Sequence, residues 1–167
     1  MATRIAKASG RGSRRWGRGQ HDNRKDPYRP NEKMPGPIVC PNCRAVFHRG
    51  RWQWAAAPDD ARQRRCEACQ RIHDKFPAGT LTLTGAVAQA SEVEALARHQ
   101  EKSEMADHPL NRIMSIEHRA GDTVVITTTD LHLPRRIARA IQKAFGGHLD
   151  EHYEKDGDTV RIAWRIS

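Results

Sequence analysis

The sequence predicts an α+β protein, and three observations lead to this fold class. The first 37 residues contain a single Leu, Ile, Val or Phe, whereas residues 110–167 contain 15 of them. Two Cys-x-x-Cys pairs lie near the middle of the chain, and segments of helical and strand periodicity alternate after them. We therefore expect three regions: an arm over 1–37, a small cysteine-held module over 38–85 and a packed domain over 86–167.

The first region is basic and poor in apolar residues. It holds ten Lys and Arg against three Asp and Glu, together with five Gly and four Pro. Such a segment buries too little apolar surface to offset its ordering entropy, so we expect a disordered basic Arg/Gly-rich arm. Arg can pair phosphates and an aromatic ring can stack on a base, which makes this arm a candidate for nucleic-acid contact. The candidate residues are Arg11, Arg14, Arg15, Trp16 and Arg18. The alternative is a solvated tail that serves only solubility.

The cysteines predict a metal site. Cys40 and Cys43 form one pair and Cys66 and Cys69 the other, with 22 residues between the pairs. Two such turns offer four thiolates, a tetrahedral shell that prefers Zn²⁺ and leaves no open position. We therefore predict a four-cysteine zinc ribbon that holds one structural Zn²⁺. Two redox pairs, which would need a βαβ context, and an iron–sulfur cluster are the alternatives. Surface positions are expected for His48 and His73, although either could replace a ligand.

The insert between the pairs alternates aromatic and basic residues. Phe47 and one Trp are expected to pack against the cysteine turns, because a small zinc ribbon has little other core. The remaining residues could form a stacking and phosphate-binding surface. The candidates for nucleic-acid contact here are Arg49, Arg51, Trp52, Trp54, Arg64 and Arg65.

The last region shows the periodicity of a two-layer αββαββ sandwich. A short alternating strand over 80–84 precedes it, at the end of the cysteine module. Its expected helices cover 91–107 and a segment from Leu133 to the Gly146-Gly147 stop, and its expected strands cover 112–118, 123–128, 148–154 and 159–166. In the last strand, Val160, Ile162, Trp164 and Ile166 share one face.

The second of these helices carries a basic stripe. Its members are Arg135, Arg136, Arg139 and Lys143, and we include the three arginines among the candidates for phosphate contact. A solvated amphipathic face is the preferred interpretation of the stripe. His148 and His152 share one strand face and are expected to be exposed rather than to bind a metal.

Charge and composition limit the classes of function. The net charge is +9, and the whole positive excess lies in residues 1–79, which favours an anionic partner such as nucleic acid. No apolar run is long enough to span a membrane, and the N-terminus lacks an apolar leader, so we expect a cytoplasmic protein. Because phosphate-loop, zinc-protease and nucleophile-elbow motifs are absent, we expect neither an enzyme nor a small-molecule substrate.

Several linked motifs carry a resemblance to a known family. They are Cys40-Pro-x-Cys43 with Arg51-Trp-x-Trp54, Cys66-x-x-Cys69-x-Arg71-Ile72, the Pro77–Gly85 segment, His108-Pro-Leu-x-Arg-Ile113 and the Thr127–Leu133 segment. Over roughly residues 24–166 the chain resembles a family of short bacterial proteins. That family is in turn similar to a reduced form of the large-ribosomal-subunit export and assembly adaptor named after nonsense-mediated decay.

The resemblance implies zinc binding by Cys40, Cys43, Cys66 and Cys69 and contact with ribosomal RNA of the large subunit. It implies no catalytic residue. The adaptor has further cysteine pairs and a tail with leucine-rich export signals, which this chain lacks, so nuclear export does not carry over.

The sequence thus predicts a non-enzymatic zinc protein that binds RNA, with the ribosome as its partner in assembly, hibernation or quality control. A DNA-binding module in transcription and a protein-interaction module are the alternatives. Neither the RNA nor the oligomeric state follows from the sequence.

Overall fold

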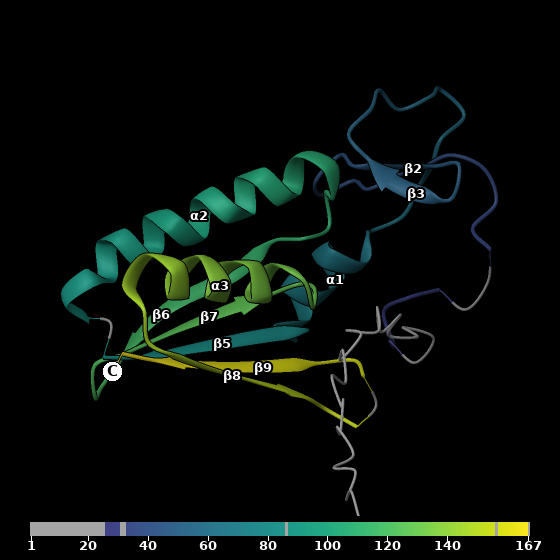
Figure 1. Ribbon diagram of the computed structural model, residues 1–167. Coiled ribbons are helices and arrows are strands. Elements are labelled where there is room, and N and C mark those ends of the chain that lie inside the picture. Colours follow the sequence, from purple (N-terminus) through teal and green to yellow (C-terminus); the bar gives the residue numbers. More distant parts are fainter. Residues whose placement is uncertain (1–25, 31–32, 86, 156, 167) are drawn as a thin grey trace, which may run out of the picture.

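A computed structural model describes residues 26–30, 33–85, 87–155 and 157–166 (Figure 1). Its mixture of helices and strands confirms the α+β fold class. Most of the predicted disordered arm lies outside the described residues, as do its candidates Arg11, Arg14, Arg15, Trp16 and Arg18. In the part of the chain that is described, no helix has both the length and the apolar character needed to cross a membrane.

The cysteine module is built on a small four-stranded sheet. Its strands are β1 (Ile38–Val39), β2 (Val46–His48), β3 (Arg51–Gln53) and β4 (Arg62–Gln63), in the order β3-β2-β1-β4. Arg49 and Gly50 form the tight turn between β2 and β3, and both have positive φ angles, as a two-residue hairpin of this kind requires. A short helix, α1 (Glu67–Asp74), follows β4. Strands of two or three residues provide little core of their own.

The second unit has two layers, with two helices on one face of a five-stranded sheet (Figure 1). The helices are α2 (Ala90–Asp107) and α3 (Leu133–Phe145), and a 3-10 turn, η2 (Val87–Gln89), leads into α2. The strands are β5 (Gly79–Thr84), β6 (Ile113–Arg119), β7 (Thr123–Thr128), β8 (His148–Tyr153) and β9 (Val160–Arg165), in the order β6-β7-β5-β9-β8.

The strand β5 differs from the predicted layout. The sequence division assigned it to the cysteine module over 38–85, but it is the central strand of the large sheet, antiparallel to β7 and parallel to β9. The αββαββ layout is therefore incomplete by one strand. Leu81 and Leu83 explain the difference, because both side chains are fully buried in the core of the second unit. Their alternation predicts a strand but not the sheet that accepts it.

The core of the second unit forms between α3 and the sheet. Ile137 and Ile141 of α3 are fully buried, which confirms the predicted apolar face of this helix. On β9 the side chains of Ile162 and Trp164 point into the same core. The exception is Ile166, which was expected on that face but lies beyond the end of β9 and is 42% exposed.

Candidate metal centre

The four predicted metal ligands come together from two short segments. Cys40 follows β1, and the turn from Cys40 to Cys43 is closed by a hydrogen bond from the Arg44 N–H to the Cys40 carbonyl (2.9 Å). Cys66 is the N-cap of α1, and Cys69 lies in the first turn of that helix. The turn after β1 therefore presents two sulfur atoms, and the start of α1 presents the other two.

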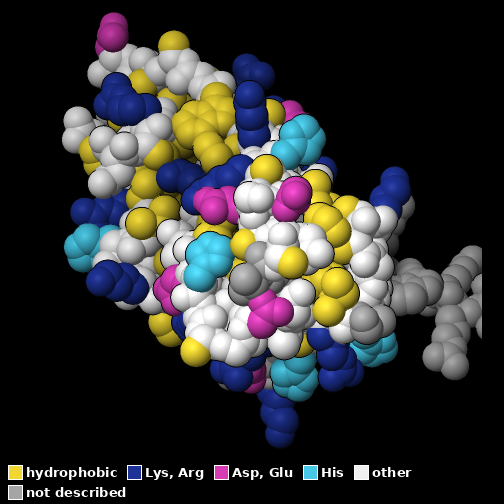
Figure 2. Space-filling view, turned by 90° about the vertical axis from the view of Figure 1, so that its left-hand side faces the viewer, with side chains coloured by type: hydrophobic (Ala, Val, Ile, Leu, Met, Phe, Trp, Pro, Cys, Tyr) yellow, Lys and Arg dark blue, Asp and Glu magenta, His cyan; other side chains and the backbone are white. Residues whose placement is uncertain are grey.

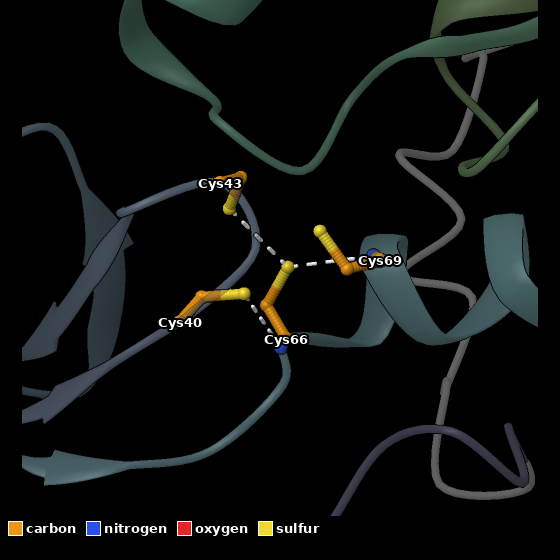
Figure 3. A group of neighbouring side chains, drawn as sticks. All are labelled: Cys40, Cys43, Cys66 and Cys69. Carbon is orange, nitrogen blue, oxygen red and sulfur yellow. Dashed lines mark hydrogen bonds between the residues drawn. The ribbon is translucent and has the colours of Figure 1, made fainter.

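The sulfur atoms point toward one another in the interior of the module (Figure 3). All four lie within 4.8 Å of one another, and Cys43 Sγ is 3.7 Å from Cys66 Sγ. A tetrahedral zinc shell with Zn–S bonds of about 2.3 Å would separate its sulfurs by about 3.8 Å. Cys40, Cys66 and Cys69 are buried. The cluster can therefore hold one metal ion without rearrangement of the backbone.

Backbone donors favour the thiolate form at two of these sulfurs. The Cys66 N–H donates to Cys40 Sγ (3.3 Å), and the Cys69 N–H donates to Cys66 Sγ (3.4 Å). Burial raises the pKa of the Cys66 thiol, and the charges of the neighbouring cysteines add to this rise. Burial would also raise the pKa of the Cys40 thiol. Backbone hydrogen-bond donors outweigh this effect and lower the pKa to about 7. Four crowded sulfurs can all ionise only when a cation compensates their charge, as a bound metal does.

Arg112 is a further part of this site that the sequence reasoning missed. It immediately precedes β6, and its guanidinium donates to Cys69 Sγ (3.5 Å) and Cys66 Sγ (3.8 Å). Burial alone would lower the pKa of Arg112, but the nearby Cys43 and Cys69 thiolates raise it. Arg112 lies in the 108–113 segment of the family resemblance, which is the only signal in the sequence that could have indicated it.

We expect Arg112→Met to weaken zinc binding about 10- to 100-fold, as removal of a partner that hydrogen-bonds a metal ligand typically does. A metal with four thiolates carries a net negative charge, and the guanidinium compensates part of it. Competition for zinc against a chromophoric chelator measures the change. Arg119→Met is the matched control, because Arg119 ends the same strand but is paired with Glu117 at the surface. Equal zinc affinity in the two variants would contradict this role.

The histidines considered as substitute ligands do not join the cysteines. His48 is exposed on β2, and His73 is exposed on α1 beside Asp74. His148, on β8, is also exposed and lies 3.3 Å from an oxygen of Asp150. Among the described residues, the group of ligand atoms that can share one ion consists of the four cysteines.

The two tryptophans of the insert have packing contacts. Trp52 meets Phe47 edge to face at 5.5 Å between ring centroids and packs against the cysteine cluster. Trp54 is 44% exposed, but its indole N–H donates to the Met105 carbonyl at the end of α2 (2.7 Å). One tryptophan therefore supports the cysteines, as expected, and the other ties the module to the second unit.

The candidate arginines of the module lie near opposite edges of its sheet. Arg49 and Arg51 belong to the β2–β3 hairpin, whereas Arg64 and Arg65 follow β4 at the other edge. Arg65 donates to the side chain of Asn42 in the first cysteine turn (3.2 Å). None of these four forms an ion pair with a described carboxylate.

The basic stripe of α3 is different, because carboxylates neutralise part of it. Arg135 pairs with Glu151 (3.1 Å), and Arg136 pairs with Glu104 of α2. Arg139 is exposed. On the face at the left of Figure 1, Lys and Arg are interspersed with Asp, Glu and His and form no continuous basic surface (Figure 2). These contacts fit the solvated face that the sequence favoured for the stripe.

Comparisons with known proteins do not assign the chain to a family. No family model, no curated protein and no solved structure matches the chain. The resemblance to the short bacterial family, and the partner that it implies, therefore stays a prediction.

Proposed function

We propose that this protein is a non-enzymatic zinc protein that binds RNA in the cytoplasm, with the large ribosomal subunit as its partner. Zn²⁺ is the proposed ion because four thiolates form a soft, tetrahedral ligand set. Four protein ligands leave no position for water or substrate, so the ion would hold the module together and would not catalyse a reaction.

The observation that supports RNA binding most strongly is the difference in charge pairing between the two units. In the cysteine module, no arginine from residue 44 to residue 65 is paired with a described carboxylate. In the second unit most arginines have such a partner; they are Arg98, Arg119, Arg135, Arg136, Arg161 and Arg165. Unpaired cations on a metal-held scaffold are typical of a surface that binds phosphates.

RNA is favoured over duplex DNA by the shape of the module. Its single helix, α1, has eight residues, and Arg71 in this helix is buried rather than presented to a groove. A helix that reads the major groove needs several exposed side chains along one face. The family resemblance, which implies the large ribosomal subunit, favours the same choice. A role in assembly, hibernation or quality control is compatible with this partner.

The proposal predicts salt-dependent binding to ribosomal RNA through the module. We expect the double variant Arg51→Ala/Arg64→Ala to lower affinity at low salt and to reduce the slope of log K against log salt by about 0.7 to 0.9 for each phosphate that is no longer neutralised. Filter binding over a salt series measures this slope. Arg98→Ala/Arg119→Ala is the matched control, because these arginines have carboxylate partners. Equal slopes for both double variants would contradict the proposal.

The ribosomal partner has a separate test. In sucrose gradients of cell lysate, we expect the protein to sediment with the large subunit at low salt and to leave it as salt rises. A signal confined to the top of the gradient at both salt concentrations would contradict the ribosomal assignment. In that case, filter binding of RNA by the purified protein would distinguish an RNA partner, which it would detect, from a protein partner, which it would not.

A further inference from the structure

The end of α1 presents an aromatic side chain to solvent. Phe76 is 49% exposed, the highest fraction among the exposed large apolar side chains of the described residues. Its ring lies 6.0 Å from the ring of Tyr28, centroid to centroid, with an angle of 34° between the two ring planes. Tyr28 belongs to the segment before β1, so two rings from distant parts of the chain meet at this helix end.

Backbone hydrogen bonds fix the position of Phe76. Lys75, the residue before it, has a positive φ of 53°. The Lys75 N–H donates to the Ile72 carbonyl (3.3 Å). The Phe76 N–H donates to the Arg71 carbonyl (3.0 Å), which completes the Schellman motif that ends many helices. A side chain on so fixed a backbone loses little conformational freedom when a ligand binds, which favours recognition at this position.

A buried cation supports both rings from the protein side. The Arg71 guanidinium lies 4.4 Å from the centroid of the Tyr28 ring and 5.7 Å from that of Phe76. Its charge is balanced by Asp26 (2.7 Å), and the Tyr28 hydroxyl donates to Asp74 (3.0 Å). These contacts hold the two rings in place, while solvent still reaches about half of Phe76.

Exposed cations lie next to both rings in the chain. Lys75 precedes Phe76 and Arg29 follows Tyr28. Both cations are exposed, and neither is paired with a described carboxylate. Arg29 also lines an open cavity of about 800 Å³ together with Arg51 of the β2–β3 hairpin. This cavity connects the segment that carries Tyr28 with a hairpin whose arginines are candidates for phosphate contact.

The most basic part of the chain joins the described structure at the same place. Residues 1–25 lie outside the described residues and carry eight Lys and Arg against one Asp. They are followed directly by Asp26, two residues before Tyr28. A polyanion that is attracted by this excess of positive charge is therefore attracted toward the two rings, which favours a nucleic acid over an apolar protein partner.

We propose that Phe76, with Tyr28 beside it, is a platform on which an unpaired base of single-stranded RNA stacks; this inference rests on the proposed function and names the feature of RNA that is recognised. Every base has an aromatic face, so an exposed ring stacks on a base without reading its identity. A base inside a duplex is already stacked and paired, so it is not available to such a ring. Lys75 and Arg29 are placed to contact the phosphates next to the stacked base.

Filter binding with an unpaired and a paired RNA tests the platform. Full-length, zinc-loaded protein is titrated with an unstructured single strand of about twelve nucleotides, and with the same strand annealed to its complement. We expect Phe76→Ala to weaken binding of the single strand about 5- to 100-fold and to leave binding of the duplex unchanged. Equal affinity of the variant and the wild-type protein for the single strand, or an equal decrease for both RNAs, would overturn the proposal.

Two further substitutions at the same position separate stacking from apolar contact. Phe76→Trp keeps a planar ring and should bind the single strand as the wild-type protein does. Phe76→Leu keeps an apolar side chain without a ring and should bind as weakly as Phe76→Ala. Ile166→Ala is the matched control, because Ile166 is 42% exposed beyond the end of β9, and it should change neither affinity. Binding by Phe76→Leu as tight as by Phe76→Trp would indicate an apolar contact and overturn stacking.

A fluorescent base reports the stacked state directly. The fluorescence of 2-aminopurine falls when the base stacks on an aromatic ring, so a series of single strands carries it at one position each. In the saturated complex, we expect lower fluorescence with the wild-type protein than with Phe76→Leu for at least one strand. Equal fluorescence of the bound strands with the two proteins at every position would overturn the platform. Should Phe76→Ala lose its fold, this comparison and the binding series with Phe76→Leu still decide.

Salt dependence separates this inference from the proposed function. Stacking involves no charge, so Phe76→Leu should lower affinity at every salt concentration and leave the slope of log K against log salt unchanged. RNA binding that has the expected salt slope but is insensitive to Phe76→Leu would overturn the platform and leave the proposed function standing. No binding of either RNA by the wild-type protein would overturn both.

Discussion

Replacing Cys66 with Ser is expected to abolish zinc binding and to unfold the cysteine module. Cys66 has two roles, because its sulfur is one of the four that can share a metal ion and also accepts the Cys69 N–H as the N-cap of α1. Binding of structural zinc contributes about 10–16 kcal/mol in small zinc modules at pH 7. The packing of strands of two and three residues is too weak to compensate for the loss of that free energy.

Zinc content by atomic absorption and hydrogen exchange by mass spectrometry measure the outcome together. Amides of β1, β2 and α1 should lose protection, while those of β7 and α3 keep it because their core is separate. Ala56→Ser is the matched control, since it places a serine in an exposed loop of the same module. A Cys66→Ser protein with one bound zinc and native protection in α1 would contradict the proposed centre.

Asp26→Ala is expected to destabilise the protein by about 3 kcal/mol, more than Arg71→Met does. The Arg71 side chain is almost completely buried, with Asp26 as its carboxylate partner and the Phe76 carbonyl as a second acceptor. Its guanidinium also lies over the Tyr28 ring at 4.4 Å. Removal of Asp26 leaves a buried charge unpaired, whereas removal of Arg71 leaves a carboxylate that water can still reach.

Urea denaturation of the two single variants and the double variant measures this asymmetry. The double variant should be more stable than Asp26→Ala alone, because it no longer contains the unpaired buried cation. The contact also holds the segment before β1 against α1. A larger decrease in stability for Arg71→Met than for Asp26→Ala would contradict this explanation.

The local parts of the structure follow closely from the sequence. The spacing of Cys40, Cys43, Cys66 and Cys69 predicted a shared metal site because each pair needs only one tight turn to present two sulfurs. The periodicity of Leu133, Ile137 and Ile141 predicted the buried face of α3 for a similar reason, since neighbours on a helix face are close in sequence. Such features depend on contacts over a few residues.

Contacts between segments that are distant in the sequence could not be predicted from it. Arg112 lies 43 residues beyond Cys69, and no spacing rule links a guanidinium to a sulfur over that distance. The same holds for the pairing of Arg136 with Glu104, which neutralises part of the basic stripe. These contacts exist only after helices and strands have packed.

The sequence by itself determined the four cysteines that can share one metal ion, the order of most helices and strands, and the excess of positive charge in the first half. Only the tertiary structure decided that β5 joins the large sheet, that Arg112 donates to the cysteine sulfurs and that Arg136 pairs with Glu104. The physical reason is the range of the interactions. Cysteine turns and helix faces are set by neighbours along the chain, whereas sheet membership and charge pairing depend on which surfaces meet when the two units pack.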